Sequence, residues 1–243
     1  MNIAGIEPCS FVDWPGRMAA VLFTPGCNLD CYYCHNRYLL DPPTGVQSVD
    51  DEAVLDWLDA RRGFLDGVVV SGGEPTLQTA LADFIERVRE RGFAVKLDTN
   101  GTRPSVLNDL FEAGLLDYVA MDIKAPENTY AQVCGVEVDQ RAVGESIRLI
   151  MAKAPDYEFR TTVVPQLREP DILEIAERIR GAKRYVLQQY RMPDGEDSSR
   201  DLRLVRSPHT FKSIQDMARK AGAWVSCCET RGLARPEPVA AFG

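Results

Sequence analysis

Three cysteines lie close together near the start of the chain, at Cys27, Cys31 and Cys34. Three residues separate the first two cysteines and two residues separate the second and third. A turn with this spacing can bring three thiolates around one soft metal centre, but it supplies no fourth thiolate. A cubane iron–sulfur cluster bound by three cysteines keeps one iron open for another ligand, and a catalytic centre needs such an open position.

The alternative is a structural zinc site or a group of reduced thiols in the core. Structural zinc needs four closed ligands, which usually come from two separated pairs. The nearest candidate for a fourth ligand is His35, directly after Cys34, and adjacent residues rarely converge on one metal. Spacing alone therefore leaves both interpretations open, and the structural context must decide between them.

Polar residues also follow three predicted strands at the points where these strands end. The first group is Gly72, Gly73 and Glu74, after a strand predicted at 67–71. Two glycines leave backbone carbonyls accessible and the carboxylate adds negative charge, so this group could bind an ammonium ion. The alternative is an ordinary turn between a strand and a helix, where glycine and proline are common.

The second group, Asp98 and Thr99, ends a strand predicted at 94–98. Its side chains could bind ribose hydroxyls or help to hold a cation, and the alternative is an Asn-Gly turn with a helix cap. The third group, Asp122 and Lys124, ends the strand predicted at 117–122. Alternation along a strand puts these two residues on one face, where an acid and a base either serve a ligand or pair with each other.

Arg160 lies on a strand predicted at 157–164. Arginine binds carboxylates through a fixed fork of donors, so Arg160 is a candidate partner for a ligand carboxylate. The alternative is an ordinary surface arginine.

These residues depend on an alternation of strands and helices to bring them together. Short β-branched runs alternate with helical patterns, which indicates a parallel sheet with helical crossovers. Ligands of such sheets bind at the carboxyl ends of the strands. Strands are predicted at 19–23, 67–71, 94–98, 117–122, 157–164, 184–190 and, as a last short strand, 224–227; helices are predicted at 50–61, 77–88, 104–113, 138–153, 172–179 and 207–221.

Six β/α units follow from the strand before the cysteines, which is too few for a closed eight-unit barrel. We therefore expect an α/β fold in the form of an open, partial (β/α)6 barrel. The expected organisation is a single domain over residues 1–243, with an N-terminal hairpin at 1–18 and the cysteine loop at 24–38.

Composition limits the class of protein. The chain has 45% hydrophobic and 26% charged residues, an ordinary balance for a globular domain. It contains no apolar run of membrane-spanning length, and its first residues do not resemble a signal peptide. Seven cysteines, three of them crowded together, argue against a disulfide framework and for a reducing cytoplasm. A net charge of −8 argues against sequence-independent binding of nucleic acid.

Nearly the whole chain resembles the radical S-adenosylmethionine (SAM) enzymes, and within them the enzymes that activate glycyl radical enzymes. The nearest resemblance is to activating proteins of anaerobic ribonucleoside-triphosphate reductase and of pyruvate formate-lyase. The resemblance rests on the cysteine spacing and on five short segments: SFVDWPG at 10–16, HNRY at 35–38, GGEP at 72–75, DTNG at 98–101 and DIK at 122–124.

The resemblance implies an open (β/α)6 barrel and one [4Fe-4S] cluster, bound by the three cysteines. It implies that the amino and carboxylate groups of SAM bind the fourth iron. Cys9, Cys134, Cys227 and Cys228 are interpreted as structural, because no cysteine lies between the cluster loop and Gly72 to bind a second cluster.

The resemblance also implies roles for the other candidate residues. Tyr33 would lie near the adenine, and the segment with Gly73 and Glu74 would bind the methionine amino group. Lys124 would contact the SAM carboxylate or the substrate peptide. The remaining expectations are that Gly72, Asp98 and Thr99 help to place SAM, that Arg160 binds its carboxylate, and that Asp98 and Asp122 lie near a monovalent cation.

The implied reaction begins when a reduced flavodoxin or ferredoxin donates one electron to the cluster. Cleavage of SAM gives methionine and a 5′-deoxyadenosyl radical, which takes a hydrogen atom from a glycine of a partner enzyme under anaerobic conditions. The glycine loop of this partner, which we expect to be an anaerobic ribonucleotide reductase, would enter the barrel mouth and contact Asp122 and Lys124. Two alternatives stay open: a radical SAM enzyme that modifies a small molecule or peptide, and a non-catalytic zinc-binding module.

Overall fold

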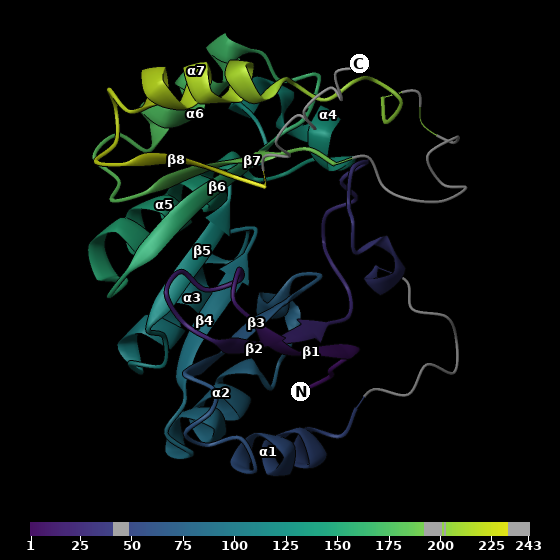
Figure 1. The fold of residues 1–243 in the computed structure, drawn as a ribbon, viewed down its shortest axis with the longest axis vertical. Helices are drawn as coiled ribbons and strands as arrows, with labels where there is room; N and C mark the ends of the chain where they lie inside the picture. Colours follow the sequence, from purple (N-terminus) through teal and green to yellow (C-terminus); the bar gives the residue numbers. More distant parts are fainter. Residues whose placement is uncertain (41–48, 192–200, 202, 233–243) are drawn as a thin grey trace, which may run out of the picture.

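An eight-stranded sheet forms the centre of the computed structural model (Figure 1). The structure describes residues 1–40, 49–191, 201 and 203–232. The strands follow one another in the sheet in the order of the chain, and β1 and β8 form its two edges. The strands are β1 (Gly5–Ser10), β2 (Ala19–Thr24), β3 (Gly67–Gly72), β4 (Ala94–Thr99), β5 (Tyr118–Asp122), β6 (Tyr157–Val163), β7 (Tyr185–Gln189) and β8 (Cys228–Arg231).

The predicted fold class is confirmed, because the sheet is mostly parallel and is not closed. Strand β1 pairs antiparallel with β2, as the predicted N-terminal hairpin requires, and all later neighbours pair in parallel. Strand β8 extends the six predicted β/α units by one further parallel strand.

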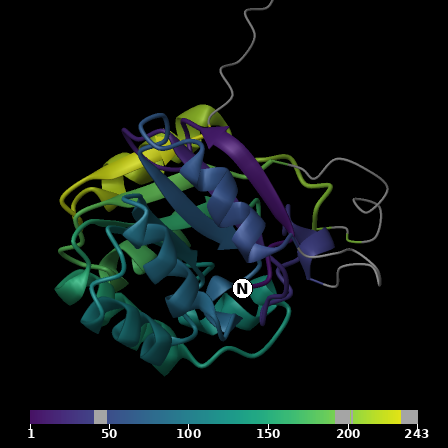
Figure 2. The same ribbon diagram turned by 90° about the horizontal axis from the view of Figure 1, so that it is seen from below.

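Most of the helices lie along the outer side of the curved sheet (Figures 1 and 2). None of those described is long and apolar enough to cross a membrane. The α-helices are α1 (Asp51–Asp59), α2 (Leu81–Glu90), α3 (Pro104–Glu112), α4 (Tyr130–Cys134), α5 (Gln140–Lys153), α6 (Glu169–Arg178) and α7 (Phe211–Ala221), and three short 3-10 helices are η1 (Arg37–Leu39), η2 (Pro75–Leu77) and η3 (Glu127–Thr129).

Helix α2 illustrates how the sequence determines these elements. Its buried residues, Leu81, Phe84, Ile85 and Val88, recur at helical spacing and cover the sheet. The helix begins later than the predicted start at residue 77. The Glu74 side chain caps η2 instead, and the backbone leaves this short turn in an extended conformation before α2 starts.

Other elements also differ from the predictions. The last strand lies at 228–231 rather than 224–227, because the chain after α7 continues in turns, with the Trp224 amide donating to the Ala221 carbonyl. Helix α4 has no counterpart among the predicted elements. It is one short turn of helix, too short for a recognisable hydrophobic period, and Gly135 ends it in the left-handed conformation with φ of 71°.

The inner face of the partial barrel has an apolar floor and a polar mouth. Trp14, from the connection between β1 and β2, lies 2% exposed in a small cluster with Val21, Val69 and Tyr118. Asp98, Asp122 and Arg160 lie nearer the carboxyl ends of β4, β5 and β6, whereas the buried Glu158 lies near the start of β6. The floor is therefore closed by side chains, whereas the mouth is lined with groups that can bind a ligand.

Candidate active site

A cavity of about 280 Å³ lies at the carboxyl ends of strands β3 to β6, beneath the cysteine loop. Of the predicted site residues, Glu74 is the only one that does not line it. The predicted residues that line it are Cys27, Cys31, Tyr33, Cys34, Gly72, Gly73, Asp98, Thr99, Asp122, Lys124 and Arg160. Positions more than 100 residues apart in the sequence therefore meet at one mouth, as the parallel sheet predicts.

The cysteine loop is fixed to the sheet at its beginning. The Gly26 carbonyl accepts a hydrogen bond of 2.8 Å from the Glu74 amide, and the Gly26 amide donates to the Leu39 carbonyl at 2.7 Å. A Cβ atom on Gly73 would lie 1.9 Å from the Gly26 carbonyl oxygen. The glycines of the GGEP segment thus let the cysteine loop approach β3 closely, besides exposing backbone to the cavity.

The loop is held at a second point by α4. The Asp30 amide donates to the Cys134 carbonyl at 2.8 Å, and a Cβ atom on Gly135 would lie 2.4 Å from the Asp30 carbonyl oxygen. The short helix that the sequence did not reveal therefore supports the cysteine loop from the far side.

The three cysteines of the loop have different environments. Burial raises the pKa of Cys27 to about 11 and also raises the pKa of Cys34. The pKa of Cys31 falls to about 7, chiefly because the Cys134 thiol hydrogen-bonds its sulfur, although burial opposes this change. Cys134 was interpreted as structural, and the structure places it against a predicted cluster ligand.

The thiols fit a cluster better than a single ion. Within the described ranges, no three side chains of the His, Cys, Asp and Glu types are grouped so that they could hold one metal ion. A cubane is wider than an ion, so the sulfur atoms that bind it stand further apart. Three cysteines that line one cavity are the donor set of such a cluster and argue against the zinc module.

Tyr33 lines the cavity beside the cysteines, and its hydroxyl is buried. The residue is 4% exposed and its ring packs edge-on against Tyr32, with 5.3 Å between the ring centroids. Its buried hydroxyl has no hydrogen-bond partner among the residues described. Buried polar groups are almost always paired, so this buried hydroxyl is an exception next to the cavity.

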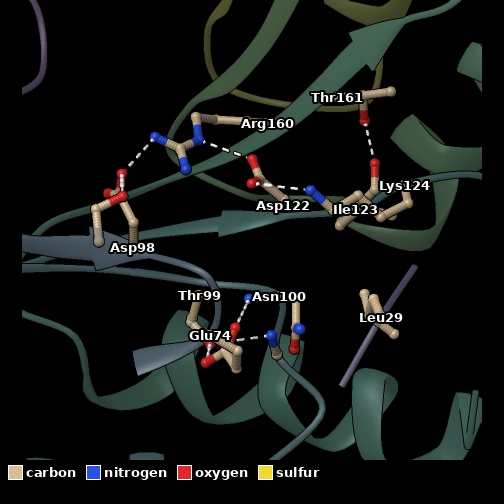
Figure 3. A network of polar contacts seen from close by, with 12 residues as sticks. Leu29, Glu74, Asp98, Thr99, Asn100, Asp122, Ile123, Lys124, Arg160 and Thr161 are labelled. Atoms are coloured by element: carbon tan, nitrogen blue, oxygen red, sulfur yellow. Dashed lines mark hydrogen bonds and ion pairs between the residues drawn. The ribbon is translucent and has the colours of Figure 1, made fainter. Parts of the chain in front are cut away.

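Opposite the cysteines, charged side chains of alternating sign form a network (Figure 3). Arg160 donates from Nε to Asp122 at 2.8 Å and from a terminal nitrogen to Asp98 at 3.2 Å. Lys124 donates to the other Asp122 oxygen at 3.1 Å, and the fully buried Lys96 contacts Asp98. Arg160 is therefore a bridge between two strand-end carboxylates and not a surface arginine.

These contacts set the ionisation of the network. Burial alone would raise the pKa of Asp122 and lower that of Lys124. The attraction of Arg160 and Lys124 for the Asp122 carboxylate outweighs burial, so the pKa of Asp122 lies well below its usual value and that of Lys124 well above. The pKa of Asp98 is lowered for the same reason, by Arg160 and Lys96. A monovalent cation between Asp98 and Asp122 would have to compete with the guanidinium that already bridges them.

Glu74 lies beneath the cavity, where it joins two strand ends. One carboxylate oxygen accepts hydrogen bonds from Thr76 and from the Thr99 hydroxyl at 2.7 Å, and the other accepts from the Asn100 amide at 2.6 Å (Figure 3). Burial raises the pKa of Glu74 despite these bonds. The geometry gives Glu74 four donors from the protein and directs it away from the cavity.

The structure also adds residues that sequence reasoning missed. Asn100 lines the cavity, and its side chain reaches Cys27. The sequence did indicate this residue, since Asn100 belongs to the DTNG segment at the end of β4. Thr162 and Gln188, on β6 and β7, also line the cavity. They carry no motif, and only the sheet register brings them to the mouth.

The chain is similar in sequence to several known proteins. A Methanocaldococcus jannaschii protein with the provisional name glycyl-radical enzyme activating enzyme is 37% identical over 80% of this chain and 82% of its own length. The pyruvate formate-lyase 1-activating enzyme of Escherichia coli K12 is 32% identical over 70% of each chain. The 7-carboxy-7-deazaguanine synthase of Thermococcus kodakarensis is 30% identical over 71% of this chain and 74% of its own length.

A solved structure supports the fold. The crystal structure of Streptococcus suis SuiB bound to S-adenosylmethionine matches 87% of this chain and 52% of its own with a TM-score of 0.65, at 13% identity. The sequence pattern of the radical SAM superfamily matches residues 21–179, which run from the strand before the cysteines to the end of α6. The chain therefore belongs to the radical SAM superfamily: it is a radical SAM enzyme whose cofactors are a [4Fe-4S] cluster and SAM.

Proposed function

We propose that this protein activates a glycyl radical enzyme by removing a hydrogen atom from a glycine of that partner. The observation that carries the proposal is the identity of 37% over 80% of the chain with a protein named as such an activating enzyme. The open mouth supports it, because a loop of another protein needs wider access than a small metabolite. The partner that we propose is an anaerobic ribonucleotide reductase.

Some residues of the cavity would bind the iron–sulfur cluster and others would bind SAM. When bound, the cluster and SAM supply the one-electron cleavage chemistry that yields a 5′-deoxyadenosyl radical. We propose that Cys27, Cys31 and Cys34 hold the cluster and that Tyr33 lies against the adenine.

The strand ends opposite the cysteines would orient SAM. The backbone of Gly72 and Gly73 would accept from its ammonium group, and Asp98 and Thr99 would bind the ribose. Its carboxylate would meet a mouth in which Arg160 and Lys124 lie beside the carboxylates of Asp98 and Asp122. Arg160 and Lys124 line the cavity and would bind the SAM carboxylate.

Glu74, Asp122 and Lys124 would act at the edges of this site. Glu74, because its oxygens are filled by protein donors, would act on SAM indirectly, by holding the ends of β3 and β4 together. Asp122 and Lys124, at the mouth, would contact the incoming glycine loop. A flavodoxin or ferredoxin would supply the electron, in the reducing cytoplasm that the free cysteines favour.

Electron paramagnetic resonance tests the proposal directly. Protein with a reconstituted cluster is mixed anaerobically with SAM, a reduced flavodoxin and either an anaerobic ribonucleotide reductase or a pyruvate formate-lyase. We expect a glycine-centred doublet in the reductase and none when Cys31→Ala replaces the wild-type protein. A doublet only in the formate-lyase would show that the partner is a formate-lyase and not a ribonucleotide reductase. The absence of a doublet from both enzymes would contradict the proposed activity.

A second candidate is a radical SAM enzyme that acts on a small molecule or peptide. The 30% identity with a 7-carboxy-7-deazaguanine synthase over 71% of the chain favours it. SAM cleavage that consumes an added small molecule, without any glycine-centred signal, would support this candidate.

A further inference from the structure

Asn100 lies where the end of β4 meets the cysteine loop. It follows Thr99 directly, is 5% exposed, and lines the cavity. Its backbone amide donates to Glu74 at 2.6 Å (Figure 3), so the position of its main chain is fixed independently of its side chain. Substitution of the side chain therefore leaves the contact between β3 and β4 in place.

The orientation of the Asn100 amide is determined by its neighbours. Its oxygen accepts from the Thr102 backbone amide at 3.0 Å and from the Thr102 hydroxyl at 2.7 Å. Two donors on one side require the oxygen there, so the NH2 group must face the cysteine loop. On that side it donates to the Asn28 side-chain oxygen at 2.9 Å and to the Cys27 sulfur at 3.8 Å, a separation suited to the larger sulfur atom.

We propose that Asn100 is a positioning residue for the iron–sulfur cluster, and that its side-chain amide donates a hydrogen bond to the ligating sulfur of Cys27. The bond has two consequences. It holds the first ligand of the loop toward the cavity, and it stabilises the more negative, reduced state of the bound cluster, because hydrogen bonds to cluster sulfurs raise the reduction potential. The Leu29 backbone amide, 3.4 Å from the same sulfur, adds a second donor that side-chain substitution cannot remove.

The bond is embedded in a small network that links the cluster loop to β4. Asn28, next to Cys27, donates back to the Thr102 hydroxyl at 2.8 Å. The amide of Asn100 and the amide of Asn28 therefore hold each other in place, and the donor that faces Cys27 is preorganised before the cluster binds.

Substitutions of Asn100 separate this role from a merely structural one. Asn100→Asp keeps the shape and the acceptor for Thr102, but it removes both NH donors and turns a carboxylate toward the sulfur. Asn100→Ala removes the donor without adding charge. Thr102→Val is the matched control, because the Thr102 backbone amide still orients Asn100 after the hydroxyl is lost.

The experiment is a redox titration of the reconstituted enzyme without SAM, monitored by electron paramagnetic resonance, together with iron and sulfide analysis. At the midpoint potential of the wild type, we expect the ratio of reduced to oxidised cluster to fall about threefold in Asn100→Ala. In Asn100→Asp we expect a fall of about tenfold, which corresponds to about 59 mV for a one-electron couple. Thr102→Val should stay close to the wild type.

Each outcome decides the matter. Loss of the cluster in both Asn100 variants, with an unchanged circular dichroism spectrum and a fully loaded Thr102→Val, supports the positioning of Cys27. An unchanged or increased ratio in both Asn100 variants, with full iron content, overturns the proposal. An equal fall in Thr102→Val also overturns it, because the effect would then belong to the loop in general and not to the amide donor.

Discussion

The backbone of Gly73 lies so close to the cysteine loop that a methyl group there would meet the Gly26 carbonyl oxygen at 1.9 Å. Gly73→Ala should therefore displace the start of the loop and with it Cys27. We expect iron after reconstitution to fall well below the about four atoms per chain of a [4Fe-4S] cluster. Gly144→Ala on α5, where the nearest atoms lie 3.7 Å away, is the control and should load fully. Full loading of Gly73→Ala would mean that the loop tolerates a shift of its anchor.

Asp122 stabilises the folded chain in a way that depends on pH. Its pKa lies well below the ordinary 3.8 because Arg160 and Lys124 bind its carboxylate. The folded protein therefore binds fewer protons than the unfolded chain, and this stabilisation is present above pH 3.8 and is lost as the pH falls toward the folded-state pKa.

Asp122→Asn should lower the free energy of unfolding at pH 7 by about 2 kcal/mol, since hydrogen bonds to charged groups are lost. The difference from the wild type should shrink below about pH 4, where protonation weakens the wild type as well. Urea denaturation of the cluster-free protein at pH 7, 5 and 3 measures this, with Asp83→Asn on the exposed side of α2 as the control. A difference that stays constant over this range would assign the effect to packing and not to charge.

Individual residues differ in how far the sequence could predict them. The local spacing of Cys27, Cys31 and Cys34 predicted that they lie together, and all three line the cavity. The place of Cys134 beside Cys31 was not predicted, because this contact depends on a short helix about 100 residues further along the chain. The role of Glu74 was also hidden, since a carboxylate beside two glycines has the same sequence whether it faces a ligand or faces Thr99.

At the scale of elements, the connection between β1 and β2 closes the floor of the barrel with Trp14. Its ring contacts Tyr118, with 6.1 Å between the ring centroids, and lies so near Gly67 that a Cβ atom there would be 2.8 Å away. Trp14→Ala would leave a cavity that the sheet cannot fill by relaxing. We expect a loss of about 3–5 kcal/mol in the free energy of unfolding.

Trp57→Ala is the matched control for this change. Trp57 lies half-buried on α1, where the Arg61 guanidinium stacks on its ring at 3.8 Å. Its removal exposes little of the core and should cost much less. Urea denaturation of both variants compares them, and equal losses would show that the floor of the barrel contributes no more than an outer helix.

The elements were predictable where one pattern determined them. The run Val68-Val69-Val70 is buried on both faces, as strands of a parallel sheet are, and it was recognised as β3. The last strand was placed four residues too early because Trp224 and Val225 look like strand residues. Their burial comes from the turn after α7, and the edge strand β8 has a polar sequence that carries no such pattern.

The whole molecule accommodates one cluster, because the other cysteines are too widely separated to bind a second. Cys9 lies on β1 and Cys228 on β8, which are the two edges of the sheet, and Cys227 is exposed. A second cluster would need ligands that converge, and the open sheet holds these apart.

Simultaneous substitution of these outer cysteines tests whether the chain binds one cluster. The triple variant Cys9→Ser, Cys227→Ser and Cys228→Ser should retain about four irons per chain and the wild-type Mössbauer spectrum, because only the loop thiols and Cys134 would remain. Cys27→Ala should lose the iron while keeping its circular dichroism, since Cys27 is only partly buried and packs at the margin of the main hydrophobic cluster. If the triple variant lost half of its iron, a second cluster site would have to form between two copies of the chain, because β1 and β8 lie at opposite edges of the sheet within one copy.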